Sequence, residues 1–246
     1  MIESFDDLHQ TNVETNDIFA SCLKSAREFV SKELGYCSEG QIYCKPAQAG
    51  AAGEYSVYED RIYVAPPIDV NEFHYKTIMT SLLIHEIAHE SASVQRMYIF
   101  SETLKESEKS NIIRVAIGMA VMGMHANTQI RHGDFFEEAF AETVAARWRS
   151  ASISGYSDNA DSLLPTADGE YLPIKYSSPS HGLDEHGSLG VSTVHSAYAA
   201  YGIELLSDHS GVDLYELMKQ ARQPDTEVTA KREIIKTFAP FSTCIP

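Results

Sequence analysis

The pentapeptide His85-Glu86-Ile87-Ala88-His89 constrains this chain more than any other stretch, because it indicates both a local conformation and a chemistry. The residues around it have the apolar spacing of a helix that begins near Asn71. Residues four apart share one face of a helix, so His85 and His89 can direct two imidazoles at one point. Two imidazoles with a glutamate between them are typical of a zinc site in which that glutamate, here Glu86, acts as general base.

The phase of this helix points both histidines toward the protein interior. Ile78 and Leu82 precede His85 and His89 at steps of four, three and four residues, so the histidines prolong an apolar stripe. An imidazole on such a face needs a partner, which is either a hydrogen bond in the core or a metal ion. Because two histidines alone hold zinc weakly, the metal hypothesis requires a third protein ligand.

The residues after the motif narrow the identity of that third ligand. One known pattern places a histidine six residues after the second histidine, with a glycine between, but this chain has Gln95 and Ala92 at those positions. The other solution is a glutamate on a second helix. Glu138 suits this role, because it lies among apolar residues where an unpaired carboxylate is costly and a zinc ion would supply the missing charge.

Capping distinguishes Glu138 from the glutamate beside it. Asp134 is expected to cap a helix that runs to about Trp148, with Glu137 three residues later in the capping-box position. Glu137 is therefore assigned a structural role and Glu138 a role at the metal. Glu142 lies one turn beyond Glu138 and can accept the remaining N–H of a zinc-bound imidazole, which would fix its tautomer.

The other segments predict an α+β chain with a mainly helical C-terminal half. Segments 54–58 and 61–65 are rich in β-forming residues around a tight turn, which predicts a hairpin just before the histidine helix. A short strand is expected at 41–44, and a long polar loop extends over about 150–190. Further helices are expected at 15–34, 111–124, 194–206, 212–222 and from Asp225 to 238, with a plain connection at 125–133.

The length is that of a single domain over residues 1–246, with an α/β subdomain at about 1–100, a helical subdomain at about 101–246 and a cleft between them. The formal net charge of −16 disfavours nucleic acid and anionic membranes as partners, because both attract basic surfaces. The most apolar run, at 115–124, is far shorter than the ~20 residues that a membrane-spanning helix needs. We therefore expect no membrane insertion.

The acidic N-terminal segment lacks the apolar core of a signal peptide, which predicts a cytoplasmic protein and leaves export by a leaderless route open. The four cysteines show neither a C-x-x-C pair nor zinc-knuckle spacing. Cys37 and Cys44 can flank a small loop and pair, but free thiols are favoured in a protein without a signal peptide. The oligomeric state is left open.

Two of these segments together resemble the zincin metallopeptidases of the glutamate-zincin branch. His85-Glu86-Ile87-Ala88-His89 matches the active-site helix of that branch, and Glu138-Ala139-Phe140-Ala141-Glu142 matches its Glu-x-x-x-(Asp/Glu) helix. Residues 135–140 also resemble the corresponding helix of lethal-factor-type peptidases. The resemblance covers about residues 41–149. It implies a zincin-like fold in which a small mixed or antiparallel sheet with an edge hairpin packs on the active-site helix.

The resemblance also implies an activity. Zn²⁺ held by His85, His89 and Glu138 would activate a water and polarise the scissile carbonyl of a polypeptide, which the edge strand holds in extended conformation. Glu86 would take the water proton and deliver it to the leaving amine. The alternative is a zinc-binding or regulatory protein with a zincin fold and little or no peptidase activity. The presence of Glu86 favours the enzyme, because a binding module has no need of the base.

Enzymes of this type usually add a tyrosine or histidine that stabilises the oxyanion. We favour His181 and His186 as catalytic candidates, because long polar loops such as theirs commonly line a cleft. The sequence leaves His132, Tyr198 and Tyr201 open as alternatives.

Overall fold

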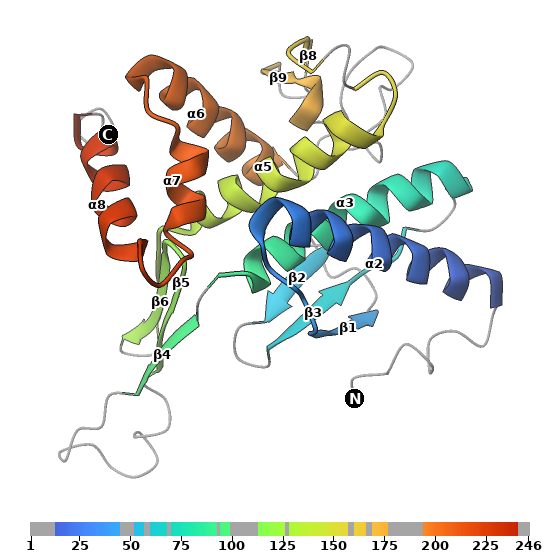
Figure 1. Cartoon of the computed structure of the whole chain (residues 1–246), viewed down its shortest axis with the longest axis horizontal. Helices are drawn as coiled ribbons and strands as arrows, with labels where there is room; N and C mark the ends of the chain where they lie inside the picture. Colours follow the sequence, from blue (N-terminus) through green and yellow to red (C-terminus); the bar gives the residue numbers. More distant parts are fainter. Residues whose placement is uncertain are drawn as a thin grey trace.

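Helix α3 (Glu72–Glu90), which carries the His-Glu-x-x-His segment, packs between two other long helices, α2 (Val13–Leu34) and α5 (Asp134–Ser152) (Figure 1). In the described residues, six α-helices and three small sheets form a mixed α+β fold with a mainly helical C-terminal half. This fold is seen in a computed structural model, which describes residues 13–44, 52–56, 60–67, 70–92, 94–98, 113–125, 128–156, 160–165, 169–176 and 194–240.

The start of α3 follows directly from its sequence. Asn71 is the N-cap, and its side-chain oxygen accepts a hydrogen bond from the backbone N–H of His74 at 2.9 Å. The helix is fully buried along Leu83, Ile84 and Ile87. Ile78, Leu82, His85 and His89 lie at the edge of this buried face and are only partly buried. The two histidines therefore lie at the boundary between the core and the solvent.

The hairpin expected before α3 is confirmed. Strands β2 (Gly53–Ser56) and β3 (Arg61–Val64) pair antiparallel, and β1 (Gln41–Cys44), also expected, pairs parallel to β3. The strand order is β1-β3-β2, so β2 is an edge strand of this sheet, and it contacts α3. Gly53 permits this contact, because a Cβ atom at that position would lie 2.4 Å from the Glu86 Oε1.

The helix expected at 111–124 is wrong, because residues 113–125 form a β-hairpin. Strands β5 (Ile113–Ile117) and β6 (Ala120–His125) pair antiparallel, and β4 (Val94–Tyr98) and β7 (Thr128–His132) complete a sheet of order β4-β5-β6-β7. The connection without regular structure that is expected at 125–133 is also wrong, because residues 128–132 form strand β7. A short apolar run fits a helix or a strand equally well, and the turn at Gly118, with φ of +50°, decides for the hairpin.

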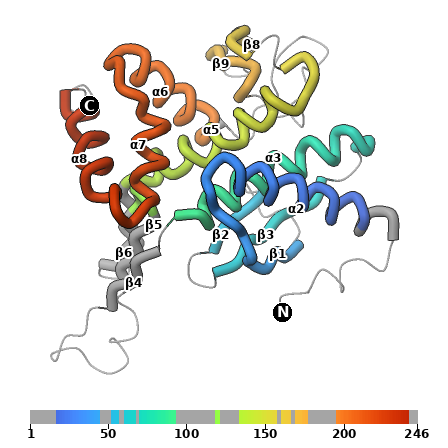
Figure 2. The backbone as a smooth tube through the Cα atoms, viewed as in Figure 1, coloured from blue at the N-terminus to red at the C-terminus, as the bar shows by residue number. Residues whose placement is uncertain are grey.

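The three expected C-terminal helices are confirmed as α6 (Val194–Ser210), α7 (Leu214–Gln220) and α8 (Glu227–Phe238). In Figure 2 the tube passes through them in turn, and α6 and α7 both contact α5. The segment expected to be a long loop contains two short strands and a 3-10 helix, namely β8 (Leu163–Pro165), β9 (Tyr171–Pro173) and η2 (Ile174–Tyr176).

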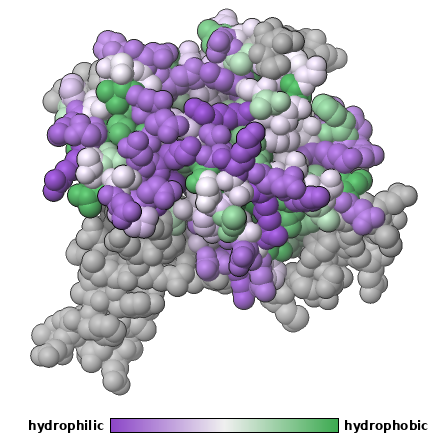
Figure 3. All heavy atoms as spheres, in the orientation of Figure 1, coloured by the Kyte–Doolittle hydropathy of each residue, from purple (hydrophilic) through white to green (hydrophobic). Residues whose placement is uncertain are grey.

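One hydrophobic core joins the N-terminal and C-terminal halves. Its buried members come mainly from α2, β1, β3, α3, α5, α6, α7 and α8, among them Val30, Ile62, Phe140, Met218 and Ile234. The face of the protein in Figure 3 is mostly hydrophilic, with small separate apolar patches. Among the described helices none is both long and apolar enough to cross a membrane.

The described cysteines are free thiols. Cys22 and Cys44 are buried and Cys37 is exposed, and burial raises the pKa of Cys44 to about 12. The Cys37–Cys44 pairing that the sequence allowed is therefore not formed in this structure. Cys244 lies outside the described residues.

The cap of α3 leads to a first prediction. Replacing Asn71 with alanine removes the hydrogen bond to the His74 N–H and should lower the free energy of unfolding by about 1 kcal/mol. Urea denaturation followed by circular dichroism measures this change. Asn71→Asp keeps an acceptor at the cap and serves as the control, so equal losses in the two variants would contradict the capping role.

Candidate metal centre

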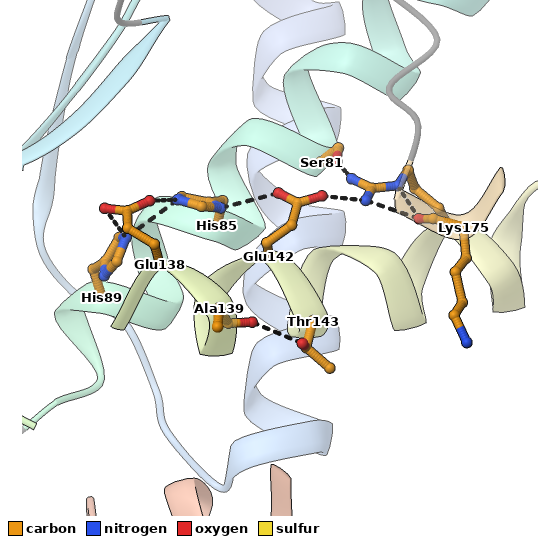
Figure 4. A network of polar contacts seen from close by, with 9 residues as sticks. Ser81, His85, His89, Glu138, Ala139, Glu142, Thr143 and Lys175 are labelled. Atoms are coloured by element: carbon orange, nitrogen blue, oxygen red, sulfur yellow. Dashed lines mark hydrogen bonds and ion pairs between the residues drawn. The ribbon is translucent and has the colours of Figure 1, made fainter. Parts of the chain in front are cut away.

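Three side chains from two helices converge on one point. His85 and His89 project from α3 toward Glu138 on α5, as Figure 4 shows. The two Nε2 atoms are 3.2 Å apart, and the carboxylate oxygens of Glu138 lie 3.4 Å from the Nε2 of His85 and 3.6 Å from that of His89. A tetrahedral zinc ion with bonds of ~2.0–2.1 Å separates its ligand atoms by about 3.3 Å. This group can therefore hold a metal ion with little rearrangement.

The close packing of α5 on α3 brings the glutamate to the histidines. Residues 139, 141 and 145 of α5 are fully buried alanines, which let the two helix backbones approach. The histidine side chains are 13% exposed, whereas that of Glu138 is 45% exposed. The three groups are thus anchored in the protein on one side and accessible to solvent on the other.

Glu142 contacts His85 at the ring nitrogen that faces away from the metal position. Its Oε2 lies 3.3 Å from the Nδ1 of His85, and its other oxygen pairs with Arg149 (Figure 4). Burial acts to raise the pKa of Glu142, but the charge of Arg149 and the hydrogen bond from His85 outweigh it and lower this pKa. The carboxylate is therefore ionised at neutral pH and accepts the Nδ1–H, which leaves Nε2 to face the metal position.

Arg149 is a residue that sequence reasoning missed. It is 2% exposed, and besides Glu142 it donates to the hydroxyl of Ser81 at 2.6 Å and to the backbone carbonyl of Lys175 at 3.0 Å. It therefore ties α3, α5 and η2 together directly behind the site. Arg149 lies seven residues after Glu142, so the two side chains share one face of the helix. This spacing is the local feature of the sequence from which the ion pair could have been predicted.

Glu86 lies under the edge strand. It is 4% exposed, and the backbone N–H of Tyr55 in β2 is its hydrogen-bond donor. Burial raises its pKa to about 7, against the opposing charge of His85 and with some support from the charge of Glu138. A carboxyl group with a pKa near neutrality is suited both to accept and to return a proton.

In the absence of a metal, the surroundings shift the pKa values of the two imidazoles in opposite directions. Burial disfavours the charged form of His85, but hydrogen bonds to Glu138 and Glu142 prevail and raise its pKa well above the ordinary value. Burial and the neighbouring charge of His85 lower the pKa of His89 to about 3. His85 thus holds a proton in the position where a metal ion would supply the positive charge.

The expected cap at Asp134 is wrong. Gly133, with φ of 82°, is the N-cap of α5 and Asp134 is the first helical residue. Glu137 does not close a capping box but accepts a hydrogen bond from the backbone N–H of Met119 and pairs with Arg222. The tertiary fold, which local capping rules do not see, provides these partners.

The candidates for oxyanion stabilisation lie in three different parts of the chain. His181 and His186 lie outside the described residues. His132 is the last residue of β7. Tyr198 and Tyr201 lie on α6 and pack against a small apolar cluster that contains Ala146, Leu172, Tyr176, Ala197 and Ala200.

Comparison of the chain with protein-family models, with curated proteins and with solved structures finds no match. The interpretation of the site therefore depends on its own residues and geometry.

Zinc binding should release a proton at neutral pH, because zinc must displace the proton that His85 holds in the metal-free protein. Below the raised pKa of His85 the apparent zinc affinity should fall by about tenfold per pH unit for one displaced proton. Calorimetric titration in two buffers of different ionisation enthalpy counts the protons released. Equal heats in both buffers, together with an affinity that does not change with pH, would contradict this prediction.

Replacing Glu142 with glutamine should weaken zinc affinity about 10- to 100-fold, because the His85 ring loses its charged acceptor. Competition with a chromophoric chelator measures the affinity. Glu204→Gln is the matched control, since Glu204 also pairs with a cation, Lys175 at 2.7 Å, but lies on α6 rather than on the helices that carry the three metal-site residues. A zinc affinity that is the same in Glu142→Gln and the wild type would rule out this role.

Proposed function

We propose that the protein is a zinc-dependent metallopeptidase with a zincin-like fold of the glutamate-zincin type. The observation that carries the proposal is the convergence of His85, His89 and Glu138 at ligand distances, with Glu86 buried between that point and an edge strand. Each part supports the same chemistry, since a hydrolytic zinc site requires three protein ligands and a nearby base.

The donor set favours zinc over the common hard cations. Two imidazole nitrogens and one carboxylate form a ligand combination that catalytic zinc sites use. Calcium and magnesium prefer sites made only of oxygen ligands. Zinc bound to these residues lowers the pKa of its water and polarises a carbonyl group.

The remaining steps belong to residues of the chain. Glu86 takes the proton of the attacking water and passes it to the leaving amine, for which its pKa near 7 is suited. Glu142, held by Arg149, keeps His85 in the tautomer that presents Nε2. The edge strand β2, whose residue Tyr55 donates to Glu86, offers backbone groups that can align an extended peptide over the site.

The Glu86→Gln variant tests the proposal. It keeps the shape of the side chain and all three ligands, so it should bind zinc as the wild type does, while the rate of peptide cleavage falls at least ~100-fold. Cleavage of an unstructured protein and of a mixed peptide library, followed by mass spectrometry, measures the rate, and Glu204→Gln is the variant expected to keep full activity.

Two results would contradict the proposal in different ways. If Glu86→Gln cleaves as fast as the wild type, the activity does not come from this site. If the wild type binds zinc but cleaves nothing in the library, the protein is instead a zinc-binding or regulatory protein with this fold.

A further inference from the structure

A second carboxylate lies beside the ligand Glu138 and points into the protein. Glu137 is 4% exposed, its Oε1 accepts a hydrogen bond from the backbone N–H of Met119 at 2.5 Å, and its Oε2 pairs with Arg222 at 2.5 Å. Successive residues of a helix project about 100° apart, so the two neighbouring carboxylates leave α5 in different directions. One faces the metal position and the other faces the rest of the fold.

Arg222 follows the end of α7 and is almost fully buried. It is 6% exposed, its guanidinium carbon lies 3.6 Å from the centre of the Phe140 ring, and its Nη1 donates to the backbone carbonyl of Met218 at 3.5 Å. A buried guanidinium requires a charged partner, since an unpaired one would be strongly destabilising. Glu137 is that partner, and the pair therefore fixes α7 against the first turn of α5.

The turn of the β5–β6 hairpin lies directly against the Glu137 carboxylate. Gly118 has φ of +50°, and a Cβ atom at this position would lie 2.3 Å from the Glu137 Oε1. Any other residue would be strained by its backbone conformation and would also displace the carboxylate. Three parts of the chain, namely α7, the β5–β6 turn and the start of α5, thus meet at Glu137.

We propose that Glu137 is a positioning residue for the metal centre, because it fixes the first turn of α5 and thereby the place of Glu138. This inference depends on the metal site proposed above. Glu138 is the proposed ligand that α5 contributes, and it follows Glu137 directly in the chain, so its place depends on the backbone that Glu137 fixes. Helix ends open more readily than helix interiors, and Glu138 lies in the second turn, next to such an end.

The Glu137→Gln variant, compared with Glu33→Gln, tests this inference. Glu33 also joins distant helices, through the Tyr215 hydroxyl at 2.8 Å and Arg147 at 3.1 Å, but it lies on α2, which contributes no residue to the metal site. Zinc affinity is measured by chelator competition at a temperature at which circular dichroism shows both variants folded. The absorption spectrum of bound Co²⁺ reports the coordination geometry. We expect about a tenfold loss of affinity and an altered spectrum in Glu137→Gln alone.

Two further variants separate positioning from a loss of stability. Gly118→Ala disturbs Glu137 from the side of the turn and leaves every charge in place, so it should also weaken zinc binding. The double variant Glu137→Met with Arg222→Met leaves no unpaired buried charge and should regain much of the stability. Its zinc affinity should stay low, since methionine cannot hold the turn to α5.

The outcomes distinguish this inference from the proposed function. If the wild type binds no zinc, the proposed function fails and the inference falls with it. If the wild type binds zinc, and Glu137→Gln and Gly118→Ala keep the wild-type affinity and Co²⁺ spectrum, the metal site stands and Glu137 only supports the fold. The inference is likewise overturned if Glu33→Gln weakens binding as much as Glu137→Gln does.

Discussion

The need to provide a partner for every charge buried around α3 and α5 is the constraint on which the rest of this structure depends. Moving a carboxylate or guanidinium out of water costs several kcal/mol unless another group replaces the solvent. Two arginines meet this demand, since Arg149 pairs with Glu142 and Arg222 pairs with Glu137. Next to the Glu142–Arg149 pair, the imidazoles and Glu138 face one another, and a divalent cation would complete that arrangement.

Close approaches of the backbone also place the proposed base and the start of α5. At Gly53 the edge strand lies against the Glu86 carboxylate, and at Gly118 a turn lies against the Glu137 carboxylate. A side chain at either glycine would occupy the space of a carboxylate oxygen. The proposed base therefore lies between α3 and the strand that would carry a substrate, and the β5–β6 turn lies against the first turn of α5.

Two of the wrong expectations, a helix at 111–124 and a cap at Asp134, have clear physical causes. The apolar run at 111–124 has no period that separates a buried helix from two strands of a hairpin. Asp134 has a residue type that suits a cap, but the chain enters α5 through Gly133 in the left-handed region. Both errors fall where a tight glycine turn, rather than propensity, directs the chain.

The local periodicity of apolar residues was sufficient to predict elements whose hydrogen bonds join residues close in sequence. It located the start of α3 near Asn71, the spacing of His85 and His89 and the hairpin before α3, because these depend on neighbours in sequence. The sequence by itself thus determined which helix carries the two imidazoles. Only the tertiary structure decided that Glu138 meets them at ligand distances and that Arg149 and Arg222 hold its helix, because these contacts join residues far apart in the chain and depend on how the helices pack.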